Sequence, residues 1–257
     1  MEKHHRAKSL SDFIKIVNDI QNQWTELEGE FIFPWFRGVS QASHKLQPGI
    51  YRKEGQDEYE DSYRHDFQQK GYPLLTDTTF GVPVSDWEWY FIMQHYGMPT
   101  RLLDWTEGSL IALYFALFYK DLSDSTNPCI WMLNPFWFNK ILHKKSQIFL
   151  FTDQILKPYL SEIWSGEPLP KNPIAFQPAY KSKRIAAQKG CFTIHGSKKN
   201  PLEEIESLSA CLQKIEIEYY YMDLVKAELS ISGITESTLF PELNGLSREL
   251  KEYWRDF

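Results

Sequence analysis

Two charged residues stand out because apolar residues flank them. Arg37 follows Trp35 at the end of a run rich in β-forming residues, and Asp104 lies between Leu103 and Trp105. An arginine at the end of a strand is well placed to reach into a cleft, where its planar guanidinium can make two parallel charge-assisted hydrogen bonds to a phosphate. A carboxylate in the same cleft can stabilise the positive charge that develops on a sugar when its glycosidic bond breaks.

Each of these residues also has a purely structural interpretation. Arg37 could stack on Trp35 and pair with a carboxylate such as that of Asp104. Asp104 could instead cap the N-terminus of a helix over residues 108–119. Capping and ligand binding are compatible, because a helix N-terminus also attracts phosphate groups.

Other side chains near these two residues could contact a ligand. His95 could hold a ribose, although a histidine at a helix end beside Gly97 commonly interacts with the helix dipole. Arg101 could bind phosphate or pair locally, and Tyr114 could stack on a base, although aromatic residues beside a buried helix are more often core. The predicted ligand-binding residues are His95, Tyr96, Thr100, Arg101, Trp105, Thr106 and Tyr114.

Hydrophobic periodicity predicts the elements that would position these residues. Residues 11–28 are typical of an amphipathic helix with Ser11 as N-cap, and residues 108–119 are apolar almost all round, as in a central buried helix. In the run 31–38, alternation puts Trp35 and Arg37 on one face and Phe36 on the other, and a proline favours an edge or irregular strand. Further helices are predicted near 52–72 (exposed), 86–96, 223–232 and 247–254, and strands over 129–133, 184–195 (broken at Gly190) and 212–220.

The irregular order of helices and strands favours an α+β fold with a mixed or antiparallel sheet flanked by helices. Residues 1–257 are predicted to be one domain, with an N-terminal amphipathic helix in 1–30 and the core in 31–257. The net charge of −6 disfavours non-specific nucleic-acid binding. Three widely spaced cysteines support neither a disulfide framework nor a zinc site, no metal site is expected, and no run of apolar residues spans a membrane. The cytoplasm is the expected compartment.

Three segments, in this order along the chain, resemble the FRG-domain family, which takes its name from a Phe-Arg-Gly tripeptide. They are Phe36-Arg37-Gly38 with Leu46–Arg52 downstream, then Met93-Gln94-His95-Tyr96-Gly97-Met98-Pro99-Thr100-Arg101-Leu102-Leu103-Asp104-Trp105-Thr106, and then Arg184–Thr193. More distantly, their layout resembles that of ADP-ribosyltransferases, in which an early arginine holds the NAD diphosphate and a late strand supplies a carboxylate.

The distant resemblance implies a catalytic set of Arg37, Asp104 and Gln188, with NAD as substrate, no required cofactor and a protein as a candidate acceptor. Gln188 occupies the late-strand position, where an amide can bind a ribose hydroxyl but cannot offset developing positive charge. Asp104 is therefore the better candidate for that role. The expected activity is that of an ADP-ribosyltransferase or an NAD glycohydrolase.

Two other function classes remain open. The first is a non-catalytic module that senses a nucleotide or binds a protein partner, which the amide at Gln188 favours. The second is a nuclease in a toxin or phage-defence setting. The acidic net charge and the lack of clustered carboxylates that could bind a metal disfavour the nuclease.

Overall fold

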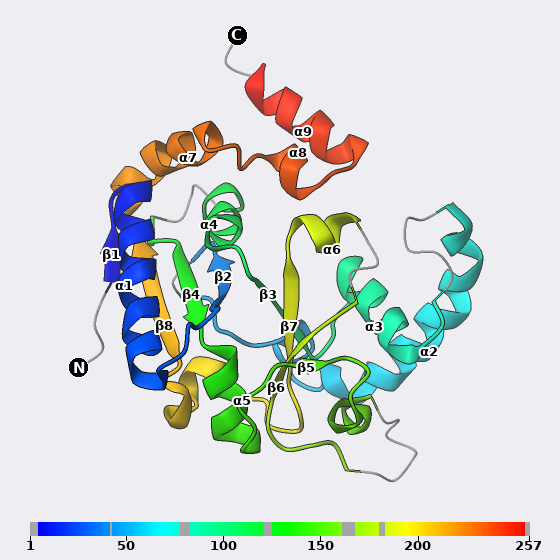
Figure 1. Ribbon diagram of the computed structural model, residues 1–257. Helices are drawn as coiled ribbons and strands as arrows, with labels where there is room; N and C mark the ends of the chain where they lie inside the picture. Colours follow the sequence, from blue (N-terminus) through cyan, green and yellow to red (C-terminus); the bar gives the residue numbers. More distant parts are fainter. Residues whose placement is uncertain are drawn as a thin grey trace.

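The computed structural model describes residues 5–41, 43–77, 83–120, 125–160, 168–179 and 183–254. Within these residues, eight strands form one mixed sheet in the order β1-β8-β4-β2-β3-β7-β6-β5 (Figure 1). The β1–β8 and β5–β6 pairs are parallel and the other pairs are antiparallel, so the predicted α+β fold with a mixed sheet is confirmed. The strands are β1 (His5–Ala7), β2 (Trp35–Val39), β3 (Leu102–Thr106), β4 (Cys129–Leu133), β5 (Phe149–Leu150), β6 (Ile174–Gln177), β7 (Gly190–Ile194) and β8 (Leu212–Ile217).

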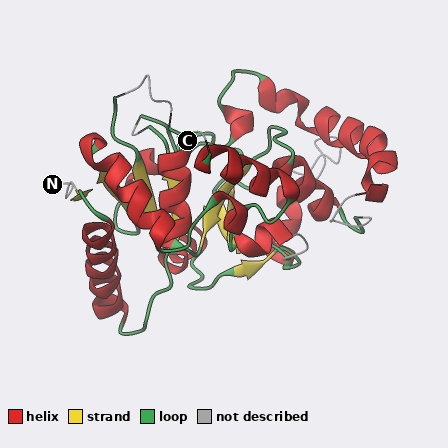
Figure 2. Cartoon of the chain, turned by 90° about the horizontal axis from the view of Figure 1, so that it is seen from above, coloured by secondary structure: helices red, strands yellow, loops and turns green. Residues whose placement is uncertain are grey.

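Helices surround the strands, as the view in Figure 2 shows. Helix α1 lies beside β1 and β8, whereas α2 and α3 lie at the other end of the molecule (Figure 1). Every helix of the described chain is too short or too polar to cross a bilayer. The helices are α1 (Leu10–Glu28), α2 (Glu60–Gly71), α3 (Asp86–His95), α4 (Ser109–Phe118), α5 (Pro135–His143), α6 (Lys183–Ala187), α7 (Met222–Ile231), α8 (Glu236–Leu239) and α9 (Leu243–Tyr253).

The buried helix predicted over 108–119 is confirmed as α4, which packs on β2 in the largest apolar cluster together with α1 and α7. Side-chain alternation in β2 is as predicted, since Phe36 joins this cluster and Trp35 joins a second cluster, together with residues of α5. A third cluster, formed by α3, β6 and β7, buries aromatic side chains such as Phe91 and Phe192. The three cysteines are buried and unpaired.

The proline predicts an edge or irregular strand, and the central position of β2 in the sheet overturns the edge alternative. Pro34 precedes the strand, so it removes no hydrogen bond from the ladder. Five residues of β2 pair with β4, but only Phe36 pairs with β3, opposite Thr106. Beyond that pair the two central strands part, and the backbone of Asp104 is left without a partner strand on the β2 side.

Other local predictions are wrong for identifiable reasons. Residues 184–187 lie in α6 and not in a strand, because Arg-Ile-Ala-Ala has good helix propensity, and β7 begins only at Gly190. Ser9, not Ser11, caps α1: its hydroxyl accepts a hydrogen bond from the Asp12 amide at 3.1 Å. The charged helix α2 buries Glu60, Asp61 and Arg64, although that segment was expected to be exposed. The hydrophobic patterns do not predict β1, β3, β5, β6, α5 or α8.

Candidate functional site

A cavity of about 660 Å³ opens where β2 and β3 part. Its size is within the usual range for small-molecule sites. Arg37, Asp104 and Gln188 all line it, and so do the predicted ligand-binding residues His95, Trp105 and Thr106. The fold therefore brings the three distant sequence segments to one hollow.

Arg37 bridges the gap between the two strands. Its Nη1 donates a hydrogen bond to the backbone carbonyl of Asp104 at 2.6 Å, which satisfies an oxygen that no β2 amide reaches. The same nitrogen lies 3.7 Å from Oδ2 of the Asp104 carboxylate. The buried Nε of Arg37 has no hydrogen-bond partner among the described residues. The guanidinium is therefore held in place while one of its donors stays unpaired.

The electrostatics of Arg37 are those of a cation that lacks full compensation. Burial lowers the pKa of Arg37, the Asp104 carboxylate opposes this shift, and the positive charge of Arg52 lowers the pKa further. An anionic ligand would offset both the cost of burying the Arg37 cation and its repulsion by Arg52. Mutual neutralisation by Arg37 and Asp104 is thus only partial.

The Asp104 carboxylate is oriented from the α3 side. Gln94 Nε2 donates a hydrogen bond to Asp104 Oδ2 at 2.7 Å, and the Thr100 hydroxyl donates to Gln94 Oε1, which fixes the orientation of the amide. The Asp104 side chain is still 55% exposed, so a ligand can reach it. Asp104 does not cap α4, because it is the third residue of β3 and Gly108 occupies the N-cap position.

Thr106 and Gln188 tie the far wall of the cavity together. The Thr106 hydroxyl donates to the Gln188 carbonyl at 2.7 Å and accepts from the Gly108 amide at 3.0 Å. The Gln188 side chain donates through Nε2 to the Leu239 carbonyl at 3.2 Å. Both residues line the cavity, but these hydrogen bonds connect the end of β3 to the segment before β7 and to α8.

Packing explains the glycine of the Phe-Arg-Gly tripeptide. Phe36 is buried against α4 and Arg37 faces the cavity. A Cβ atom at Gly38 would lie 1.8 Å from the Ala112 carbonyl oxygen of α4, a distance that no side chain can occupy. Gly38 therefore allows α4 to lie directly on β2 beside Arg37.

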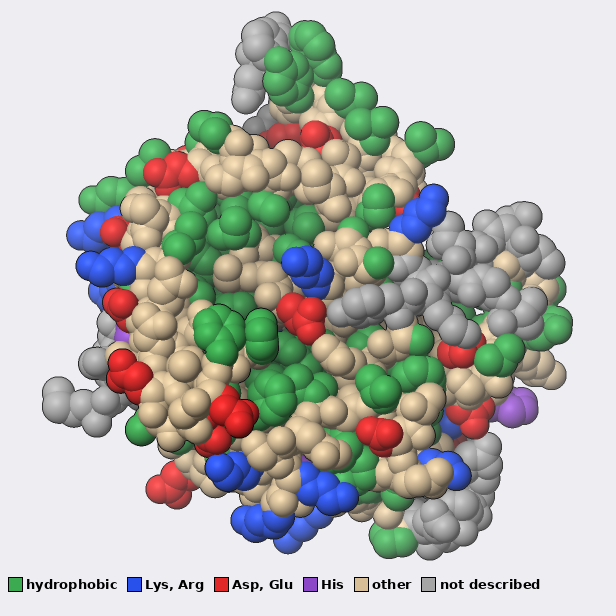
Figure 3. Space-filling model, in the orientation of Figure 1, with side chains coloured by type: hydrophobic (Ala, Val, Ile, Leu, Met, Phe, Trp, Pro, Cys, Tyr) green, Lys and Arg blue, Asp and Glu red, His purple; other side chains and the backbone are tan. Residues whose placement is uncertain are grey.

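The cavity walls combine aromatic and basic side chains. Among the described lining residues, Asp104 is the only acidic one. The Lys and Arg residues that line the cavity are Arg37, Lys45, Arg52 and Arg184. On the face shown in Figure 3, hydrophobic side chains gather near the middle, with a basic and an acidic side chain among them. The aromatic lining residues are Phe36, Phe91, Trp105, Phe115, Tyr119 and Phe192.

His95 contributes a neutral imidazole to this wall. Burial lowers its pKa to about 4, and the nearby charge of Arg184 acts in the same direction. At neutral pH it can therefore accept or donate a hydrogen bond without adding positive charge. The Arg184 guanidinium itself lies 4.7 Å above the ring of Phe240.

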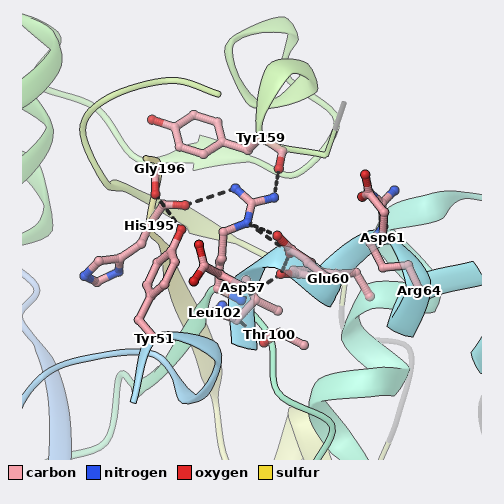
Figure 4. A network of polar contacts seen from close by, with 12 residues as sticks. Tyr51, Asp57, Glu60, Asp61, Arg64, Thr100, Leu102, Tyr159, His195 and Gly196 are labelled. Atoms are coloured by element: carbon pink, nitrogen blue, oxygen red, sulfur yellow. Dashed lines mark hydrogen bonds and ion pairs between the residues drawn. The ribbon is translucent and has the colours of Figure 1, made fainter. Parts of the chain in front are cut away.

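Arg101 does not line the cavity. Its partners Glu60, Tyr159 and His195 belong to the polar network in Figure 4. Arg101 is 1% exposed, its Nε is 2.7 Å from Glu60 Oε2, and its terminal nitrogens donate to the carbonyls of His195 and Tyr159. This arginine holds α2 and two loops against the end of β3. Its donors meet protein partners, and the structure gives it no access to the cavity.

Three more predicted ligand-binding residues lie outside the main cavity. Tyr114 is buried, stacks on Phe118 with ring centroids 4.2 Å apart, and donates its hydroxyl to Glu236 at 2.5 Å. Tyr96 is exposed and does not line the cavity. Thr100 is buried and lines a smaller adjoining hollow.

Several lining residues escaped prediction although they lie in the segments that carry the resemblance. Gln94 precedes His95, Arg52 ends the segment that begins at Leu46, and Arg184 begins the third segment. Their positions in these segments make them candidate site residues. No local sequence pattern, however, distinguishes a polar side chain that faces a cavity from one that pairs in the interior.

The fold and the site define an α+β protein with an electropositive, aromatic-walled cleft at a split in its central sheet. Residues 34–125 match the family model of the FRG domain, which supports the resemblance of this part of the chain to that family. This range includes Arg37, Gln94 and Asp104 and ends before Arg184 and Gln188. No curated protein and no solved structure matches the chain, so these comparisons give no support to the resemblance to ADP-ribosyltransferases.

Proposed function

We propose that the central cavity binds a nucleotide of the NAD or ADP-ribose class. The observation that carries this proposal is the state of Arg37, which is fixed at the mouth of the strand gap with a buried, unpaired Nε. The Arg37 side chain is 18% exposed, so a phosphate in the cavity can approach its guanidinium and offset the charge that Arg37 and Arg52 place in the cleft.

The aromatic walls support the base-binding half of the proposal. Phe115, Tyr119 and Phe91 line the same cavity as the arginines. Flat, polarisable bases bind well to aromatic rings, and one hollow that offers both rings and guanidinium groups matches the two halves of a nucleotide.

Asp104 gives the proposed site a route to chemistry on NAD. Breaking the bond between nicotinamide and ribose leaves positive charge on the ribose, and a carboxylate held by Gln94 stabilises that charge. Nicotinamide leaves with the bonding electrons, and water or a nucleophile of an acceptor protein forms the new bond to the ribose carbon. With water the reaction is that of a glycohydrolase, and with a protein acceptor it is ADP-ribosyl transfer.

A non-catalytic nucleotide sensor is the second candidate. It is favoured because Asp104 is the only carboxylate among the described lining residues, which leaves no second one in that set to serve as a general base. The sensor and the enzyme share the same ligand and differ in turnover.

Binding is tested by the thermal unfolding midpoint with ADP-ribose or NAD, since a ligand that binds only the folded state raises it. We expect a shift for the wild type and for Lys15→Gln, an exposed position on α1, and little or none for Arg37→Gln. Equal shifts in Arg37→Gln and Lys15→Gln, or no shift with either ligand, would refute the proposal.

Turnover is tested by release of nicotinamide from NAD, with and without candidate acceptor proteins. Asp104→Asn keeps the size of the side chain and removes its charge. Nicotinamide release by the wild type that Asp104→Asn abolishes supports the enzyme, whereas binding without release assigns the site to a sensor.

A further inference from the structure

A second hollow of about 430 Å³ adjoins the main cavity. Four residues line both spaces, and they form the partition between them: Arg37, Arg52, Gln94 and Asp104. A ligand that extends from one hollow into the other must therefore pass over two arginines and one carboxylate.

The partition is suited to a group with more than one negative charge. Arg52 is anchored through its Nε, which donates to the Gln47 carbonyl at 3.0 Å. Burial is the main cause of the lowered pKa of Arg37, and the positive charge of Arg52 lowers that pKa further. Two like charges beside a single carboxylate leave the partition positive, and a diphosphate brings the charge that would balance it.

The two hollows differ in their other lining residues. Aromatic rings line the main cavity, whereas the described residues around the second hollow include none and instead supply Lys53, Gln56 and the segment Gly97–Thr100. A flat base suits the first space. A polar, sugar-bearing group suits the second, where an ammonium group, an amide and backbone groups can bind it.

We propose that the ligand is a dinucleotide that occupies both hollows. Its diphosphate lies over Arg37 and Arg52, one base stacks in the main cavity, and the second nucleoside half reaches Lys53 and Gln56. This places a sugar next to the partition, beside the Asp104 carboxylate. The inference rests on the proposed function, to which it adds a second binding region with Arg52 and Lys53 as binding residues.

Calorimetric titration with AMP, ADP-ribose and NAD tests this arrangement. AMP fills the main cavity and brings one phosphate, so we expect the wild type to bind NAD about tenfold or more tightly than AMP. Lys53→Gln changes only the second hollow. It should weaken NAD binding about fivefold and leave AMP binding within about twofold.

Arg52→Gln is the companion variant, because it removes a charge that both halves of the ligand use. It should weaken NAD and ADP-ribose more than AMP, since AMP lacks the diphosphate. Lys15→Gln is the matched control for the loss of one positive charge elsewhere on the surface, and unfolding midpoints verify that each variant is folded.

The outcomes separate this inference from the proposed function. Equal affinities for AMP and NAD, together with an unchanged affinity in Lys53→Gln, would overturn the two-hollow arrangement and leave a mononucleotide site. Failure of all three nucleotides to bind the wild type would overturn both proposals. A preference for NAD over AMP that falls about fivefold in Lys53→Gln would support the inference.

Discussion

Arg37 and Arg101 lie in different environments in the same fold. Arg37 follows Phe36 in β2, Arg101 directly precedes β3, and the sequence predicts that both contact a ligand. Arg101 donates to Glu60 and to two backbone carbonyls in the interior. Arg37, which lines an open cavity, donates to one carbonyl and keeps a buried, unpaired Nε. The number of donors that the protein itself satisfies, and not burial alone, distinguishes the structural Arg101 from Arg37, the arginine that we propose binds the ligand.

The pKa values differ in direction for the same reason. Burial lowers the pKa of both guanidinium groups. In Arg101 burial is the largest single cause, but the Glu60 carboxylate, Tyr90 and Tyr51 together outweigh it, and the pKa rises above its ordinary value. In Arg37 the Asp104 carboxylate, 3.7 Å away and largely solvated, does not outweigh it, and the pKa falls. The Arg101–Glu60 ion pair is therefore buried, whereas the Arg37–Asp104 pair lies at the cavity and is partly exposed.

The largest expected effect is the destabilisation caused by Arg101→Gln. The substitution leaves the Glu60 carboxylate buried without its cation, and breaking a buried pair in this way costs about 3–5 kcal/mol. Urea denaturation measures the free energy of unfolding. The double variant Arg101→Gln/Glu60→Gln should recover part of the loss, and a cost for Arg101→Gln below about 1 kcal/mol would contradict a structural role.

The same buried region should make stability depend on pH. Burial lowers the pKa of His195 to about 4, and the nearby charge of Arg101 acts in the same direction. In the unfolded chain the pKa is about 6.5, so between these values the unfolded state binds more protons and stability falls as pH falls. Above about pH 6.5 the imidazole is neutral in both states and contributes no pH dependence.

We therefore expect His195 to lower the free energy of unfolding by roughly 2 kcal/mol between pH 6.5 and 5. His195→Gln, which has no titrating ring, should flatten that part of the curve by a similar amount, whatever its stability at pH 7. His95 and His143 also have lowered pKa values, so some slope remains in the variant. An unchanged slope would mean that His195 protonates in the folded state as easily as in the unfolded chain.

Gly38→Ala tests the packing of α4 on β2 beside Arg37. The added methyl group meets the Ala112 carbonyl oxygen, and because that atom belongs to the backbone of α4, the helix must move. Overpacking of this kind typically costs about 1–3 kcal/mol. Denaturation of Gly38→Ala beside Gly49→Ala, where an added Cβ would find its nearest neighbour at 3.8 Å, isolates the clash from the general effect of replacing glycine. Equal costs at the two positions would argue against it.

Hydrophobic pattern in the sequence predicts the helices and strands whose own residues are apolar along their length. Helix α4 is apolar all round, and strand β4 is a short apolar run, so both were found. The burial of Arg101 in a polar network could not be predicted in this way, because its partners Glu60, Tyr159 and His195 lie 41, 58 and 94 residues away in the sequence. Arg37 and Asp104 were nominated from their apolar neighbours, but the parting of β2 and β3 that opens the cavity depends on pairings across the whole sheet.

The smallest expected effect on stability completes the comparison, since Arg37→Gln makes the same chemical change as Arg101→Gln. Removing the Arg37 guanidinium removes the cost of burying a cation whose charge Asp104 only partly offsets. Water in the open cavity can then donate a hydrogen bond to the Asp104 carbonyl in place of Arg37. The free energy of unfolding should change by no more than about 1 kcal/mol, as is usual away from buried networks. The same protein should lose affinity for ADP-ribose. A stability cost for Arg37→Gln that equals the cost for Arg101→Gln would show that Arg37 is a second structural arginine, because a group that mainly holds the fold together cannot also be left free for a ligand.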